Sequence, residues 1–504
     1  MRVIDVGGQL EEAHGAVRAR MATGEPSTWA EEDKLTIGQL PVDSRVKGLP
    51  EKRSFGSDFP FRDFGQRAGI SVGSGMNDAV VSGAYGGFSN VWGAQIMPFT
   101  TATFRDWPIK VEEMHRHYAA VLGQIPYAAE DDDLSMLFPI LSDSQPLPHV
   151  SDRTASVLRR YERHRGQLHR RGVLLGRARL ALDSRSCVLA GLCMTGCPYS
   201  LVYSASHTMD ALRKRGAIDY RSGLLAVRVG EDADGATVVA KDLATGRLHE
   251  FRADRVVLGC GAIGTSRLVM GSLGLYDTPV AVAESVQFML PFFSRRGSPD
   301  PRLASDFTLN QFNMVLDLDG TGYDVTQLHF YTYNPSFEDA LPSPLKARWG
   351  SAANTYLLRR LSVALGYLPS WASPNFKVTA RPAPDGELPR LELPSEPRSF
   401  ARNPMLRDTL RRLTAAAPLL DLWPVLPMLR MAAAAKSYHW GALFPHTERP
   451  QGRFASDSLG RVAPWTRIHL ADGSVFPSVA ATTFTLTVMA NAHRIASDAL
   501  RLST

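Results

Sequence analysis

One stretch near the C-terminus is the most informative part of the chain. It reads Ala471-Asp-Gly-Ser-Val-Phe-Pro-Ser-Val-Ala-Ala-Thr-Thr-Phe-Thr-Leu-Thr-Val-Met-Ala-Asn-Ala-His-Arg-Ile-Ala496. An Asp-Gly-Ser loop opens the stretch, a threonine-rich turn follows, and a helix is expected over residues 487–500. A short aromatic segment, Tyr438-His-Trp-Gly441, lies upstream.

Two glycine-rich segments earlier in the chain complete the pattern. They are Gly86-Gly-Phe-Ser-Asn-Val-Trp-Gly93 and Val256-Val-Leu-Gly-Cys-Gly-Ala-Ile-Gly264. Taken with the two C-terminal segments, and in this order, they resemble the glucose-methanol-choline family of FAD-dependent oxidoreductases. The matches run from Arg2 to the C-terminus, so the resemblance covers nearly the whole chain.

The resemblance implies an α/β fold with two domains, as the length of 504 residues also suggests. A Rossmann-like FAD-binding domain, truncated at its N-terminus, is expected over residues 1–275 and again over 436–504. Residues 276–435, which alternate strands with many prolines, are expected to form a discontinuous α+β substrate-binding domain on an antiparallel sheet. The C-terminal part of the FAD-binding domain carries the expected catalytic histidine.

The glycine-rich turn that holds the FAD pyrophosphate in such folds is missing at the start of the chain. Instead, Arg2-Val-Ile-Asp-Val-Gly7 reads as a second strand, with Asp5 placed to accept hydrogen bonds from the adenosine ribose. The segment Gly73–Asp78 has Asp where the third glycine belongs. Three explanations stay open: a mis-set start, a split gene, or a partner chain that supplies a strand and a helix of roughly 30 residues.

The composition favours a soluble protein in the cytoplasm. Hydrophobic residues make up 44% and charged residues 21%. The net charge is +6 and the pI about 9.1, but the basic residues are scattered and no nucleic-acid module is recognisable. No signal peptide is seen at the start. The apolar stretch 413–435 contains three prolines, which predicts a proline-kinked helical pair rather than a membrane-spanning helix.

The four cysteines predict neither a disulfide framework nor a metal site. Cys187, Cys193 and Cys197 lie close together in the sequence, but their spacing does not fit the usual iron-sulfur runs. The segment Gly191–Pro198 resembles a tight turn that several family members have without metal. No metal is therefore expected.

Three residues are catalytic candidates. His439 matches the family's catalytic histidine, which the resemblance makes a general base facing the flavin, whereas the alternative is a core histidine tied to a carbonyl. The second catalytic position falls on Thr483, where most members have His or Asn. Threonine can donate a hydrogen bond to an alkoxide but is no base near neutral pH. His446 is a candidate for the missing donor, or else a satisfied neighbour.

The resemblance also implies a set of FAD contacts. Small residues let backbone approach the flavin, and the late loop reaches the pyrophosphate. The implied residues are Asp5, Gly86, Gly87, Ser89, Asn90, Trp92, Ala226, Gly261, Ala262, Asp472, Gly473, Phe484 and Thr485. A related branch links FAD covalently through a histidine at the position of Val91, so FAD is expected to be non-covalent here.

The strand Gln327-Leu-His-Phe-Tyr-Thr-Tyr333 alternates strictly, which places Gln327, His329 and Tyr331 on one face. Such a face suits a polyhydroxylated ligand, because aromatic rings stack on sugars and polar tips bond their hydroxyls. An ordinary solvent-facing strand is the alternative.

These observations predict an enzyme that oxidises an alcohol group of a sugar, glycosylated metabolite or polyol by hydride transfer to flavin. The Gly-Gly-x-Ser-x-x-Trp-Gly form resembles family branches that act on sugars and in biosynthesis. Two alternatives remain: a degenerate flavoprotein fold without FAD that serves as an interaction subunit, and a flavin-dependent reductase of a C=C or C=O bond.

Overall fold

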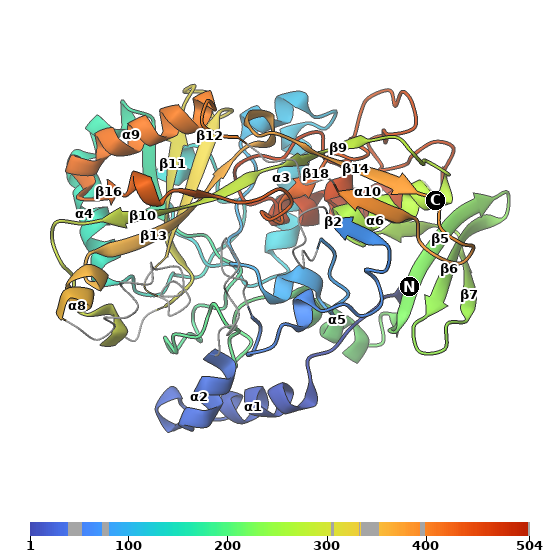
Figure 1. Cartoon of the computed structure of the whole chain (residues 1–504), viewed down its shortest axis with the longest axis horizontal. Coiled ribbons are helices and arrows are strands. Elements are labelled where there is room, and N and C mark those ends of the chain that lie inside the picture. The colour runs from blue at the N-terminus through green and yellow to red at the C-terminus, as the bar shows by residue number, and fades with distance from the viewer. Residues whose placement is uncertain are drawn as a thin grey trace.

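A computed structural model describes residues 1–38, 53–72, 80–303, 307–331, 333, 352–393 and 399–501 (Figure 1). The segment Gly73–Asp78 lies outside the described residues. Within the described part, strands and helices alternate along the chain, and the α/β class expected from the sequence is confirmed. No helix in these ranges combines the length and the apolar character needed to cross a membrane.

The largest sheet is antiparallel throughout and has seven strands. Its order is β16 (Trp423–Pro424), β10 (Val286–Phe293), β13 (Leu361–Leu368), β12 (Val325–Tyr331), β11 (Asn310–Asp317) and β3 (Val173–Arg177), with β17 (Arg430–Met431) also pairing with β10. This is the antiparallel sheet predicted for the substrate side. The sheet also includes β3, which lies outside the range 276–435 predicted for the substrate-binding domain.

Helices α4 (Asp152–His169) and α9 (Pro404–Leu420) cover one face of this sheet, as Figure 1 shows on the left. Their apolar faces join the strands in one buried cluster that includes Tyr161, Phe288 and Leu413. The opposite face turns toward the middle of the molecule, where the cavity lies.

Of the two helices predicted over residues 413–435, the structure contains only the first. The first helix is α9, which ends at Leu420 despite Pro418 in its last turn. The second half forms β16, the short turn η9 (Leu426–Met428) and β17 instead. Pro424 and Pro427 each lack the N–H that a helix interior needs, which favours edge strands and turns there.

A five-stranded sheet crosses the middle of the molecule in the order β18 (Trp440–Gly441), β9 (Val280–Glu284), β14 (Phe376–Arg381), β15 (Arg390–Leu393) and β2 (Ile70–Val72). It joins segments that lie far apart in the sequence. The strand β9 runs directly into β10 of the large sheet through Ser285, so the two sheets share one continuous segment.

The predicted dinucleotide-binding side contains two separate parallel pairs. Strand β1 (Arg2–Ile4) pairs with β4 (Asp219–Arg221), and β8 (Val256–Leu258) pairs with β19 (Ile468–Leu470). Beside them stands the antiparallel sheet of β5 (Leu224–Asp232), β6 (Gly235–Asp242) and β7 (Leu248–Ala253). No described strand joins the two parallel pairs.

Several helices surround these strands. Helix α6 (Ala262–Ser272) follows β8, and α10 (Thr485–Arg501) packs against α3 (Val111–Leu122). Helix α10 starts two residues before the predicted helix and ends one residue after it. The other helices in the described residues are α1 (Glu12–Ala22), α2 (Glu31–Gly38), α5 (Ala205–Lys214) and α8 (Ala352–Leu358). Two short 3-10 turns, η3 (Gly87–Asn90) and η10 (Gly473–Val475), contribute residues to the cavity wall.

Candidate active site

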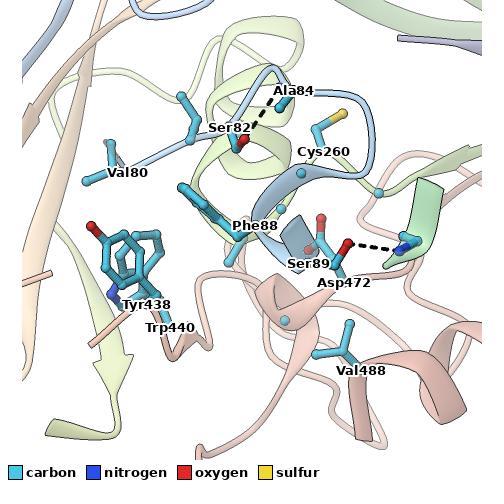
Figure 2. A pocket seen from close by; sticks show the side chains of 18 of the residues that line it. Val80, Ser82, Ala84, Phe88, Ser89, Cys260, Tyr438, Trp440, Asp472 and Val488 are labelled. Atoms are coloured by element: carbon cyan, nitrogen blue, oxygen red, sulfur yellow. Dashed lines mark hydrogen bonds between the residues drawn. The ribbon is translucent and has the colours of Figure 1, made fainter. Parts of the chain in front are cut away.

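A cavity of about 1620 Å³ runs between the parallel strand pairs and the large sheet. One end is bordered by β1 and β8, and the other by His439 and the strands β12 and β13. Figure 2 shows Ser89, Cys260 and Asp472 grouped on one side of this space and Tyr438 and Trp440 on another. Most of the site residues predicted from the sequence line this cavity.

The predicted glycine segment forms a tight turn on the cavity wall. Gly86 has φ 87°, and a Cβ there would lie 3.0 Å from the Ser204 hydroxyl, so only glycine fits without strain. Gly87 also has a positive φ, and a Cβ on it would project into open space. Ser89 accepts the Ala205 N–H at 2.9 Å, which fixes the turn against α5. Trp92 donates to the Tyr203 carbonyl at 2.7 Å.

Asn90 belongs to this turn but does not line the cavity. Its side-chain amide donates to the carbonyls of Tyr85 at 3.0 Å and Gly87 at 2.8 Å, and its oxygen accepts from Ser204. These bonds occupy the amide within the protein. Asn90 therefore shapes the glycine turn rather than contacting a ligand.

A second backbone surface lies where β8 ends and α6 begins. A Cβ on Gly259 or on Gly261, whose φ is 79°, would meet no neighbouring protein atom within 4 Å. Ala262 is the first residue of α6, so the helix N-terminus faces the cavity, where its free N–H groups favour anions. This open backbone suits close approach by a ligand.

Asp472 ties this surface to the late loop. Its carboxylate accepts from the Thr265 hydroxyl of α6 and from the Ser474 N–H at 2.9 Å. Burial raises the pKa of Asp472, and these hydrogen bonds act in the opposite direction. Gly473 follows, and a Cβ there would lie 2.8 Å from the Trp440 carbonyl. The late loop is thereby packed directly on the strand that follows His439.

Asp5 lies at the end of β1 and lines the cavity as predicted. Its carboxylate accepts from the Tyr220 hydroxyl at 2.8 Å. Burial raises the pKa of Asp5, while the bond from Tyr220 lowers it. Ala226, on the neighbouring strand β5, also lines this end of the cavity.

His439 lies at the far end between two aromatic rings. The Tyr367 ring stacks on its imidazole, with centroids 4.9 Å apart and planes 19° apart, and the Phe484 ring lies 4.9 Å away on a tilt of 48°. Phe484 precedes α10, whose first residue, Thr485, also faces the cavity. These contacts fix the plane of the imidazole beside open space.

A buried carboxylate holds the loop that carries His439. Glu284 is fully buried and accepts the N–H groups of Ala435 and Ser437, each at 3.2 Å, and the Ser437 hydroxyl at 2.8 Å. The Ser437 oxygen accepts the His439 N–H at 3.2 Å. Ala435 and Tyr438 have positive φ values of 62° and 57°. Glu284 therefore stabilises a conformation that this backbone rarely adopts alone.

Thr483 lines the same end of the cavity. Its side chain is buried, and its hydroxyl has no hydrogen-bond partner within the described part of the chain. A buried hydroxyl without a partner costs about 1 to 3 kcal/mol. A ligand oxygen in the cavity is the partner that this position could receive.

His446 is not among the residues that line the cavity, so the structure does not bring it to His439 as a donor. Its ring nitrogens contact the Asp457 carbonyl at 2.6 Å and the Asn491 amide at 3.1 Å. Burial lowers the pKa of His446 to about 3. It is a neutral histidine built into the packing between the late loop and α10.

The strand β12 sends His329 and Tyr331 to the cavity wall, as its alternation predicts. Gln327 is different, because it is fully buried away from the cavity and donates to the sulfur of Met97 at 3.3 Å. Gln287 and Tyr367, which the sequence reading missed, complete this wall. Gln287 donates to the Tyr367 hydroxyl at 2.7 Å from directly across the β10–β13 ladder.

The cysteine-rich turn borders the cavity through Met194 and Thr195. Cys187, Cys193, Cys197 and Cys260 are all free thiols. No set of three His, Cys, Asp or Glu side chains is placed to hold a metal ion in the ranges that the structure describes.

Comparison with known proteins gives matches in structure only. No protein-family model and no curated protein sequence matches the chain. The chain is similar in fold to a pyridoxine 4-oxidase from Mesorbium loti, with a TM-score of 0.56 and 13% identity over 83% of this chain and 84% of that one. It is also similar to a formate oxidase from Aspergillus oryzae RIB40, studied for FAD modification, with a TM-score of 0.55 and 14% identity over 84% of each chain. The chain therefore shares the fold of these two oxidases.

Proposed function

We propose that this protein is an FAD-dependent oxidoreductase that oxidises an alcohol group. The observation that carries the proposal is one continuous cavity with two chemically different ends. Backbone glycines and the N-terminus of α6 line the first part, and His439, Thr483 and the N-terminus of α10 line the other. The similar folds of a pyridoxine oxidase and an FAD-containing formate oxidase support it.

The residues present fit FAD on two counts. Gly87, Gly259 and Gly261 leave open space where a side chain would stand, which lets a flat or phosphorylated ligand reach the backbone. The N-termini of α6 and α10 face the cavity and favour negative charge on a pyrophosphate or a reduced ring. Asp5 would bind the ribose hydroxyls. Bound FAD would supply the hydride acceptor.

In this proposal His439 takes the proton of the substrate hydroxyl at a ring nitrogen. The stack on Tyr367 and the Glu284 contacts hold the imidazole in one orientation, which is the geometric requirement for a general base. The Thr483 hydroxyl donates to the developing alkoxide oxygen, and this contact satisfies its otherwise unpaired group. His439 is the only base that this scheme requires.

The wall opposite is proposed to bind the substrate. His329, Tyr331, Gln287 and Tyr367 combine ring faces with amide and hydroxyl groups. Such a surface stacks on a ring and bonds its hydroxyls, so the proposed substrate is a sugar, a glycosylated metabolite or another polyol. A hydroxylated aromatic ring, as the name of the pyridoxine oxidase suggests, would make the same contacts.

Visible absorption spectroscopy tests the proposal. The purified protein, with FAD added and the excess removed, is expected to keep a flavin spectrum. Sugars, polyols, pyridoxine and formate are then compared for anaerobic bleaching of the bound flavin. His439→Ala is expected to keep the flavin and to slow bleaching by about 10² to 10⁴. A protein that remains colourless under all conditions would instead favour a flavin-free interaction subunit, and bleaching unchanged in His439→Ala would remove the proposed base.

A further inference from the structure

Arginines gather where strand β10 ends and strand β13 begins. Phe293, the last residue of β10, pairs with Leu361, the first residue of β13. Beyond that rung, the Ser294 N–H donates to the Arg360 carbonyl at 2.9 Å, so the two chain segments stay side by side past the end of the ladder. The arginine rim is defined here as the arginines of these two segments, namely Arg295, Arg296, Arg359 and Arg360.

The charge of the arginine rim is not neutralised by carboxylates. Within the described residues, none of its guanidinium groups forms an ion pair, and two of them donate to backbone carbonyls instead, Arg359 to Ser298 at 2.6 Å and Arg360 to Tyr356 at 3.1 Å. Asp300, in the same loop as Ser298, is already paired with Arg302 at 2.6 Å. Like charges held together repel one another, and a bound anion offsets that repulsion.

A hollow of about 750 Å³ lies on the arginine rim. Its lining residues are Gly297, Ala352, Thr355, Tyr356, Arg359 and Arg360. A fifth arginine, Arg153, reaches the rim and donates to the Arg359 carbonyl. Guanidinium and hydroxyl groups are the donors that bind phosphate oxygens in proteins. The hollow therefore suits a phosphate group.

Large apolar side chains are exposed beside the rim. Tyr356 of α8 is 53% exposed, and Leu426 of the turn η9 is 41% exposed. The Arg360 guanidinium lies 3.6 Å from the centroid of the Tyr356 ring, and the Arg295 guanidinium lies 4.4 Å from that of the Trp423 ring in β16. Helix α8 and strand β16 lie at the same end of the molecule, on the left in Figure 1. Guanidinium groups and apolar groups therefore share one surface.

The apolar residues distinguish between the anionic ligands that arginines bind. A small phosphate compound needs only the guanidinium and hydroxyl donors, and Leu426 would stay in contact with water. An anionic phospholipid surface uses both kinds of group. Its headgroups accept hydrogen bonds from arginine, and its interfacial region takes up tyrosine, tryptophan and leucine side chains. The combined surface therefore favours a membrane over a small anion.

We propose that this end of the large sheet docks on an anionic phospholipid surface. The arginine rim binds headgroup phosphates, and Tyr356, Trp423 and Leu426 enter the interfacial region. Contact of this kind is peripheral, because the protein lies on the bilayer without crossing it. The inference stands independently of the proposed oxidoreductase activity.

Sedimentation with vesicles tests the proposal on the full chain. The protein is expected to pellet with phosphatidylcholine vesicles that contain phosphatidylglycerol and to stay in solution with pure phosphatidylcholine. Raising the salt from about 0.1 M to about 1 M shortens the Debye length from about 10 Å to about 3 Å, and it is expected to release most of the bound protein. Equal pelleting with both kinds of vesicle, or no pelleting with either, would overturn the proposal.

Charge variants locate the contact. Arg359→Gln combined with Arg360→Gln is expected to weaken vesicle binding about 25-fold, since each arginine near an anionic surface contributes about fivefold. Arg228→Gln combined with Arg247→Gln is the matched control, because both arginines are exposed and lie in or beside the β5–β7 sheet at the other end of the molecule (Figure 1). An equal loss of binding in the two double variants would contradict the assignment.

An apolar pair of variants tests insertion into the interfacial region. Leu426→Ser is expected to weaken binding about fivefold through loss of buried apolar area. Leu248→Ser is its control, because Leu248 is 50% exposed on β7. Thermal unfolding of each variant checks that the fold is kept, and the salt and lipid dependence of the unsubstituted protein does not rely on any variant.

Two further probes represent other anionic partners. Inorganic phosphate that binds the protein in the absence of vesicle binding would assign the arginine rim to a small anion. Polyglutamate that binds while anionic vesicles do not would assign it to an acidic protein. Either result would overturn membrane docking, whereas vesicle binding that resists millimolar phosphate supports it.

Discussion

The imidazole of His439 lies flat against the ring of Tyr367, and the Tyr367 hydroxyl is in turn held by Gln287. The stack joins His439, which directly precedes β18, to strand β13 of the large sheet. It brings the proposed base and the proposed substrate wall into direct contact. The orientation of the imidazole therefore depends on a residue outside the motif that identifies it.

Substitutions of Tyr367 should distinguish the contribution of its ring to catalysis from the contribution of its hydroxyl. Tyr367→Phe keeps the stack, whereas Tyr367→Leu removes it and is expected to lower kcat about tenfold, the equivalent of a stacking energy near 1 kcal/mol. Stopped-flow flavin reduction over a range of substrate concentrations measures kcat and KM separately. A purely structural role would lower the stability of both variants without changing kcat.

Loss of the Glu284 carboxylate should destabilise the His439 loop. Glu284→Ala leaves buried N–H groups of Ala435 and Ser437 without an acceptor, and the expected loss is about 3 kcal/mol in the free energy of unfolding. Urea unfolding measures this loss. Glu392→Ala is the control, because Glu392 is half-exposed in a surface ion pair and should cost less than about 1 kcal/mol. Equal losses would contradict the assignment.

The Thr483 hydroxyl should matter for activity and not for folding. Thr483→Val keeps the shape and removes a buried group that has no partner within the described residues, so stability is expected to stay equal or rise by about 1 kcal/mol. Flavin reduction is expected to slow about tenfold or more through loss of the donor. A marked loss of stability would show that the hydroxyl is bonded in the free protein.

Buried His446 should make the protein less stable in mild acid. Its pKa is lowered to about 3 by burial, whereas the unfolded ring titrates near 6.5. Below that pH only the unfolded state takes up the proton, so stability is present at pH 8 and falls as the pH falls. The expected contribution lost by pH 5 is about 2 kcal/mol. Urea unfolding at both pH values should show a smaller drop for His446→Gln than for the control His249→Gln, whose side chain is exposed.

The sequence was most informative for site residues that belong to short local motifs. Asp5, Gly86, Ser89 and His439 line the cavity because their motifs are local turns and strand ends. The strand periodicity also identified the His329 and Tyr331 face. Such features depend on a few neighbouring residues, which a single sequence contains.

The supporting contacts could not be predicted in this way. Glu284, Gln287 and Tyr367 act through sheet register, and no local pattern in the sequence determines which residues face each other across β10 and β13. His446 was predicted as a donor beside His439 because the two residues are close in sequence. In the structure, His446 does not line the cavity. Asn90 was predicted to contact the ligand, but its side-chain amide donates to two backbone carbonyls instead.

The short segment from Glu284 to Gln287 gives both partners of the stack a common anchor. Glu284 holds the loop of His439, the Ser285 N–H donates to the His439 carbonyl at 3.1 Å, and Gln287 holds the Tyr367 hydroxyl. The same stretch of backbone holds both the His439 ring and the Tyr367 ring. A small shift of the sheet therefore moves the two rings together and leaves the distance between them unchanged. If the proposed substrate wall binds substrate, its outer strands can be repacked without misaligning the imidazole, and we expect substitutions in those strands to change specificity while the proposed base stays in place.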